Sequence, residues 1–160
     1  MTFTKTNTAK LILILLIAFN LAFIFYQSIL SKEESGEVSD NVSDVLEEII
    51  PPDTKPGEFV HKNVRKIAHF VEFFSLGALS SAYIFFFMRS YKNAALTLPS
   101  AILVALIDET IQIFSDRGPS VKDVWIDASG FFVASLIFYT VATILVLIVK
   151  KVNNNRQIKE

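Results

Sequence analysis

Four long apolar stretches constrain this 160-residue chain more than any other feature of its sequence. They run over residues 11–30, 67–88, 94–114 and 124–149. A helix needs about 20 mostly apolar residues to cross the hydrocarbon core of a bilayer, and each stretch has that length. Because backbone groups inside lipid must be hydrogen-bonded within the protein, we expect an all-α, polytopic membrane protein with four transmembrane helices.

The same stretches leave little chain for anything else. We therefore expect a single membrane domain over residues 1–160.

The composition excludes several other classes of site and partner. Cys is absent, which excludes disulfides and thiolate metal sites. The net charge of −1 argues against a nucleic-acid partner. The first stretch exceeds the about 7–15 apolar residues of a cleaved signal peptide, so we expect it to be retained as a helix.

Charged flanks predict how the chain is oriented. Lysine and arginine favour the cytoplasmic side of a membrane. The flanks at residues 88–93 and 149–159 are basic and carry no acid, whereas the loop over residues 31–66 holds nine of the sixteen acids. We expect both termini in the cytoplasm and the long loop outside the cell.

The long loop itself contains a helical pattern. Its apolar stripe consists of Val38, Val42, Val45, Leu46 and Ile49. This spacing puts the stripe on one face of a helix, with acids on the other face, and Pro51 would end it. We expect an extracellular amphipathic helix between the first and second spans. It fits either the outer membrane surface or a solvated position against the rest of the protein.

Ionisable and polar side chains inside the apolar stretches are the main functional candidates. A charge at mid-helix costs about 2.5–3.5 kcal/mol on insertion scales, so its position is informative. With the orientation above, these side chains fall at one depth near the outer membrane boundary. They are His69, Glu72, Asp108, Glu109, Gln112 and Asp127. The inner halves of the spans lack ionisable groups, which disfavours a proton- or ion-coupled transporter.

Further charges border this polar layer. Arg65 and Lys66 fit either interfacial anchors or contacts to an anion. Arg117 suits either a structural ion pair or the binding of a phosphate. Ser120 lies three residues before Asp123, a spacing that predicts an N-terminal cap for the fourth helix.

Three sequence blocks have specific spacing. RKIAHFVEFFSLGAL, over residues 65–79, contains Lys-x-x-His-Phe followed by an aromatic residue and Leu-Gly. DETIQIFSDRGPSVKD, over residues 108–123, contains Asp-Glu-x-x-Gln-x-Phe and then Arg-x-x-Ser-x-x-Asp. The last block continues to Asp127 and Gly130. Together they resemble the VanZ-like family of small multi-pass bacterial membrane proteins, in which Asn is usual where this chain has Asp127.

The resemblance implies a protein of the bacterial cell membrane. The founding member of the family is linked to low-level resistance to teicoplanin, a glycopeptide with a lipid tail that acts outside the cell membrane. We therefore expect this protein to lower susceptibility to such a lipoglycopeptide through its outer polar site. The expected partners are membrane lipid and either a lipoglycopeptide or a lipid-linked wall precursor.

Two hypotheses share the same residues. In the first, the protein is a non-catalytic binding protein, and its ligand-binding residues are Arg65, Lys66, His69, Glu72, Asp108, Glu109, Gln112, Arg117, Ser120, Asp123 and Asp127. In the alternative, the protein is a membrane enzyme acting on a lipid-linked envelope substrate. His69 would then be a general base or a metal ligand. The acid/base groups or hard-metal ligands would be Glu72, Asp108, Glu109 and Asp123.

A histidine among carboxylates suits Mg²⁺, Mn²⁺ or Zn²⁺. The sequence contains no HExxH motif, P-loop or nucleophile elbow. It therefore specifies neither a reaction nor a cofactor.

Overall fold

The structure, a computed structural model, describes residues 2–88, 95–118 and 120–157, and this part of the chain contains helices and no strand. The elements are α1 (Thr2–Ile29), α2 (Lys32–Glu47), α3 (Lys55–Lys62), α4 (Val64–Tyr83), a π-helical turn η1 (Ile84–Met88), α6 (Thr97–Ile113) and α7 (Val121–Gln157). The all-α class predicted from the apolar stretches is confirmed for the described residues. The basic flank expected at residues 88–93 lies almost entirely outside them.

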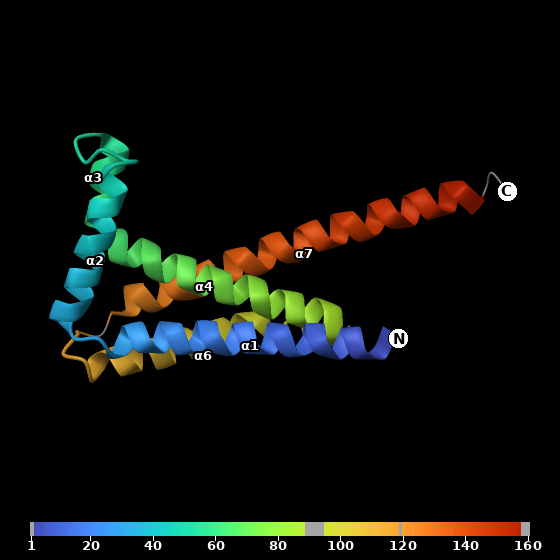
Figure 1. Ribbon diagram of the computed structural model, residues 1–160, viewed down its shortest axis with the longest axis horizontal. Coiled ribbons are helices and arrows are strands. Elements are labelled where there is room, and N and C mark those ends of the chain that lie inside the picture. Colours follow the sequence, from blue (N-terminus) through green and yellow to red (C-terminus); the bar gives the residue numbers. More distant parts are fainter. Residues whose placement is uncertain (1, 89–94, 119, 158–160) are drawn as a thin grey trace.

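The helices α1, α4, α6 and α7 run roughly along the long axis of the molecule in alternating directions (Figure 1). Helix α7 packs on α4 and α6, and α1 packs on the same two helices. Helices α2 and α3 stand across one end of this bundle, and both chain termini lie toward the other end (Figure 1). Because the helix directions alternate, four helix ends lie together at the end of the bundle that α2 crosses. They are the last turns of α1 and α6 and the first turns of α4 and α7.

Within the described residues, three segments are long and apolar enough to cross a membrane. They are Asn7–Ile29, Val64–Met88 and Val121–Asn155. The predicted third span is present as the helix α6, but its 17 residues make it too short to be one of the three. The predicted fourth span lies within α7, which starts at Val121 and continues through the polar tail to Gln157.

The amphipathic helix expected in the long loop corresponds to α2. It begins with a capping box that the sequence analysis missed: the Glu34 amide donates to Ser31 Oγ at 3.2 Å, and the Ser31 amide donates to Glu34 Oε2 at 2.8 Å. Val38, Val42 and Val45 are exposed, and Val38 and Val42 also line a cavity between α1, α2 and α4. The bundle therefore leaves the stripe partly uncovered.

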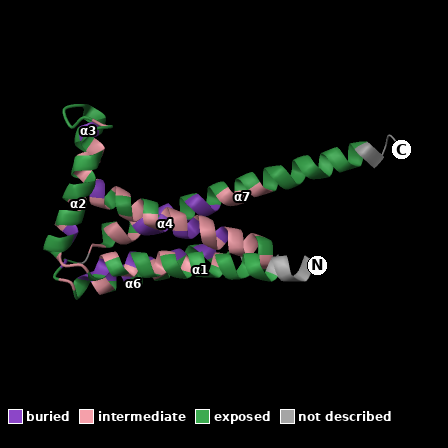
Figure 2. Cartoon of the chain, viewed as in Figure 1, coloured by how far each residue is buried: buried purple, intermediate pink, exposed green. Residues whose placement is uncertain are grey.

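Apolar side chains also cover the outside of the long helices. Figure 2 shows that most of α1 and the C-terminal half of α7 are exposed along their length. The exposed positions include Leu15, Phe19 and Leu147. An apolar surface this extensive is expected to contact lipid rather than water, which supports a membrane protein.

Close backbone contact joins α4 and α7. A Cβ atom at Gly77 would collide with the backbone of Phe131, and a Cβ atom at Gly130 would collide with the backbone of Phe70. Small residues allow this kind of approach between membrane helices, which is held by van der Waals packing rather than by the hydrophobic effect. Phe73 and Phe131 are buried in the core beside this contact.

We predict that Gly130→Ala lowers the free energy of unfolding in detergent micelles by about 1–3 kcal/mol, because the added methyl group must push two backbones apart. Thermal or denaturant unfolding followed by circular dichroism measures this change. Gly36→Ala is the control, since a Cβ there meets nothing within 4 Å. Equal stability of the two variants would contradict the proposed role of the glycine contact.

Candidate functional site

A polar cavity of about 370 Å³ lies at the end of the bundle where α4 and α7 begin. We call it the polar cavity. Of the residues predicted from the sequence, Arg65, Lys66, His69, Gln112, Arg117, Asp123 and Asp127 line it. These residues come from three helices and the α6–α7 connection, so the alternating helix directions bring them together.

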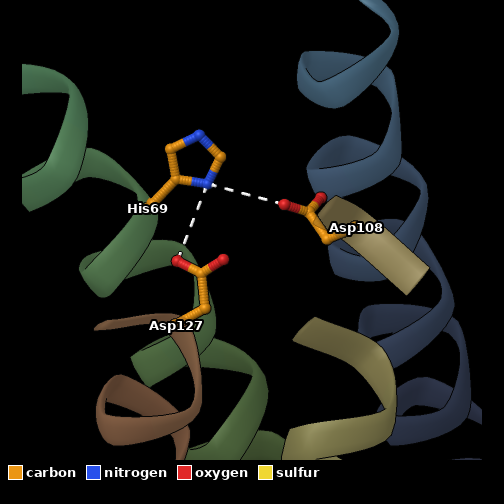
Figure 3. A group of neighbouring side chains, drawn as sticks. All are labelled: His69, Asp108 and Asp127. Carbon is orange, nitrogen blue, oxygen red and sulfur yellow. Dashed lines mark ion pairs between the residues drawn. The ribbon is translucent and has the colours of Figure 1, made fainter. Parts of the chain in front are cut away.

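Three side chains from three helices meet in one cluster (Figure 3), and two of them, His69 and Asp127, line this cavity. His69 of α4 directs Nδ1 between the carboxyl groups of Asp108 in α6 and Asp127 in α7 (Figure 3). The distance from Nδ1 is 3.9 Å to Asp108 Oδ2 and 3.8 Å to Asp127 Oδ1. We call these residues the His69 cluster. The Asp108 and Asp127 side chains are 0% and 1% exposed, so both carboxyl groups are removed from water.

Neighbouring side chains hold Asp108 in place. Ser28, a fully buried residue of α1, donates a hydrogen bond to Asp108 Oδ1. Gln112 Nε2, one helical turn after Asp108, donates to Asp108 Oδ2 at 2.7 Å. Gln112 Oε1 in turn accepts from Arg65 Nη2 at 3.3 Å. A chain of hydrogen bonds therefore links the cavity wall at Arg65 to the buried carboxyl group.

Asp127 has a different environment. Neither of its carboxyl oxygens, nor His69 Nδ1, has a hydrogen-bond partner in the described part of the chain. An ionised group buried without a partner costs several kcal/mol. The cluster thus contains one carboxyl group held by donors and one that faces the histidine without any.

Arg117 places buried positive charge on the cavity wall. Its side chain donates from Nη2 to the Gln27 carbonyl at 3.1 Å, while Nε and Nη1 find no hydrogen-bond partner among the residues described. Burial, together with the nearby charge of Arg65, lowers the pKa of Arg117. An arginine stays protonated at neutral pH despite such a shift. Arg117 therefore offers charged donors to an anion in the cavity.

The position of Arg117 follows from the local backbone. Asp116 has a φ of 56°, in the left-handed region that Asp tolerates better than most residues. This conformation reverses the chain after α6, and the Arg117 amide then donates to the Gln112 carbonyl at 3.2 Å. The reversal turns Arg117 back over the end of α6.

Glu109 contacts the start of α7 rather than the His69 cluster. Its Oε1 accepts a hydrogen bond from the Ser120 amide. The predicted cap is formed by Ser120, whose Oγ accepts from the Asp123 amide at 3.3 Å. In a capping box, the side chain of Asp123 would accept from the Ser120 amide. Here Glu109, from another helix, accepts this hydrogen bond instead. Glu109 and Ser120 together fix the connection between α6 and α7.

Glu72 also lies apart from the polar cavity. It lines a smaller cavity of about 220 Å³ between α1, α2 and α4, which it shares with Arg65 and His69. Its Oε2 atom is unpartnered among the described residues. His69 therefore lines both cavities, whereas Glu72 lines only the smaller one.

Sequence reasoning missed several parts of the site. Further residues that line the polar cavity are Lys32, Lys62, Asn63, Asp116, Gly118 and Ile126. Lys32 and Lys62 reach it because α2 and α3 lie across the end of the bundle. Ser28 was also missed; the available signal was a hydroxyl group in the last turn of an otherwise apolar span.

We predict that Ser28→Ala lowers the free energy of unfolding by about 1–3 kcal/mol, because Asp108 Oδ1 loses a buried donor. Denaturant titration of the purified protein measures this change. Ser129→Ala is the matched control, since Ser129 is exposed and bonds only to the Ile126 carbonyl of its own helix. A Ser28→Ala variant as stable as the control would show that Asp108 does not depend on Ser28.

A family model described as VanZ/LLP1 matches residues 10–146. This range includes every residue of the His69 cluster and the predicted residues that line the polar cavity. Comparison with curated proteins gives no match, and comparison with solved structures gives none either.

Proposed function

The chain belongs to the VanZ/LLP1 family, and we propose that it is a cell-envelope membrane protein whose polar cavity binds the anionic headgroup of an amphiphile. The observation that carries this proposal is Arg117, which is 6% exposed, lines the cavity, and has two guanidinium nitrogens without a hydrogen-bond partner in the described structure. A buried guanidinium with free donors is well suited to phosphate or carboxylate.

Other cations extend this anion site. Lys32, Lys62, Arg65 and Lys66 line the same cavity. Their spread around the opening favours a headgroup with more than one anionic oxygen. The apolar outer surface of the neighbouring helices would allow the lipid tail of the ligand to stay in the bilayer while the headgroup enters the cavity.

The proposal includes a topology. We place four spans in the membrane of a bacterial cell, with α6 as the third, both termini in the cytoplasm, and α2 on the outer surface. Two features support this arrangement: α6 runs antiparallel to α4 and α7 along the bundle (Figure 1), and the valine stripe of α2 is exposed. The polar cavity would then open toward the outer leaflet.

In this topology the ligand would be a lipoglycopeptide such as teicoplanin or a lipid-linked wall precursor. Both carry a lipid tail and at least one anionic group, and both are expected at the outer surface of the membrane. Binding the antibiotic would remove it from its target, and binding the precursor would shield the target. Either route would lower susceptibility to the antibiotic.

A membrane enzyme acting on a lipid-linked envelope substrate is the second candidate function. The specific observation that favours it is the convergence of His69, Asp108 and Asp127 directly beneath an anion-binding cavity. A general base or metal ligand and two acids would then lie close to the headgroup of the substrate.

We predict that Arg117→Ala weakens binding of an anionic amphiphile at least about tenfold, because a charged hydrogen bond to a buried donor is worth roughly 1.5–3 kcal/mol. The protein is reconstituted in phosphatidylcholine nanodiscs, and affinity is measured separately for teicoplanin and for a lipid-linked wall precursor. The two ligands distinguish the two sources of the headgroup.

Lys122→Ala is the control for this measurement, since Lys122 is exposed and close in sequence to the cavity without being among its lining residues. It should bind both ligands like the natural protein. Failure of the natural protein to bind either ligand, or an equal loss in both variants, would overturn the proposed function.

We predict that reporter fusions after Met88 and after Lys151 both report cytoplasm, and that a fusion within α3 reports the exterior. The reason is that an even number of spans separates the two cytoplasmic points. A pair of enzymatic reporters, one active only in the cytoplasm and one only outside, measures this. Opposite locations for Met88 and Lys151 would refute the four-span topology.

A further inference from the structure

We infer that His69, Asp108 and Asp127 bind a divalent transition-metal ion, Zn²⁺ or Mn²⁺, beneath the polar cavity. The inference deepens the proposed function and partly rests on it, because the ion would contact the anionic headgroup from the inner side. The geometry and the burial of the His69 cluster carry it independently of any ligand.

The three side chains lie close enough together to share one metal ion. One ligand atom from each lies within 4.8 Å of the others. Two ligands at a tetrahedral angle around one ion, at bond lengths of about 2.0–2.2 Å, are separated by about 3.3–3.6 Å. Side-chain movements of up to about an ångström would therefore bring the three ligand atoms around one ion.

The burial of two carboxyl groups in the cluster also favours a bound cation. Asp127 is 1% exposed, and both of its oxygens lack a hydrogen-bond partner in the described residues. His69 Nδ1, which faces it, is in the same situation. An ion at the centre would satisfy Asp127, Asp108 and Nδ1 at once, whereas each is costly to bury alone.

Asp108 has the surroundings of a metal ligand. Carboxylates that bind metals are themselves held by hydrogen bonds, which orient them toward the ion. Ser28 and Gln112 do this for Asp108 from two directions. An imidazole ligand favours Zn²⁺ or Mn²⁺ over Ca²⁺, which prefers oxygen ligands.

The site leaves coordination positions free on the side of the cavity. His69 and Asp127 are cavity-lining residues, and Arg117 lines the same cavity. Three protein ligands with an open position are typical of metal sites that take an exogenous ligand. The ion would also offset the charge of the acids that line the cavity, which are Asp116, Asp123 and Asp127.

The test uses the full-length protein in phosphatidylcholine nanodiscs, stripped with EDTA and titrated with Zn²⁺ or Mn²⁺ alone. Calorimetry measures Zn²⁺ affinity, and electron paramagnetic resonance detects bound Mn²⁺. We expect about one ion per chain, and a loss of affinity of at least tenfold in Asp127→Asn and in His69→Gln. Circular dichroism and melting curves verify that each variant is folded.

Asp116→Asn is the matched control, because it is the same substitution on the same cavity outside the His69 cluster. Asn tolerates the φ of 56° at this position as Asp does. It should bind the ion like the natural protein. If the natural protein binds no ion, or if Asp116→Asn loses affinity as much as Asp127→Asn, the metal site is refuted and a shared proton must satisfy the cluster.

The two proposals fail separately. Amphiphile binding and its dependence on Arg117 are measured again in EDTA. Persistence of both in a protein that binds no metal refutes only the metal site. Metal binding without any amphiphile binding refutes only the proposed function.

Discussion

The backbone contact between α4 and α7 determines where the functional side chains lie. Gly130 touches the backbone of Phe70, the residue after His69, and Asp127 precedes Gly130 by about one helical turn. The approach that glycine permits therefore sets the separation of His69 and Asp127. Asp108 is brought to the same point from α6, and Ser28 of α1 completes its hydrogen bonds. Four helices thus contribute to one buried polar centre.

Above this centre, the α6–α7 connection controls the charge of the cavity wall. The left-handed Asp116 turns the chain, and Glu109 binds the first amide of the following cap. Both features fix Arg117, whose guanidinium group is buried without enough partners of its own. The wall of the cavity consequently combines cations with acids and a histidine.

Much of the fold could be predicted from sequence because lipid imposes strong rules on length and polarity. The apolar runs predicted the long helices, and the polar residues inside these runs included Asp108 and Gln112, which are joined by a hydrogen bond. Contacts between helices were harder to predict from the sequence. Ser28, in the last turn of α1, has no sequence feature that distinguishes it from other serines in membrane helices. No local motif links Glu109 to Ser120. Glu72 faces a different cavity because helix rotation depends on packing against α1 and α2. The length of α6 depends on where the connections before and after it begin, and the hydrophobic periodicity of the sequence defines such helix ends poorly.

The length of α7 has a consequence for how the molecule is immersed. Between Asp127 and Lys150 the helix rises about 35 Å, slightly more than the roughly 30 Å of hydrocarbon in a bilayer. A continuous helix is stiff along its axis, so a shift of one end moves the other end by nearly the same distance. Attraction of Lys150 and Lys151 to the phosphates of one leaflet would therefore hold Asp127 at the opposite hydrocarbon boundary. Thinner or thicker membranes would then shift the buried centre relative to its aqueous entrance, and access to the cavity would depend on bilayer thickness.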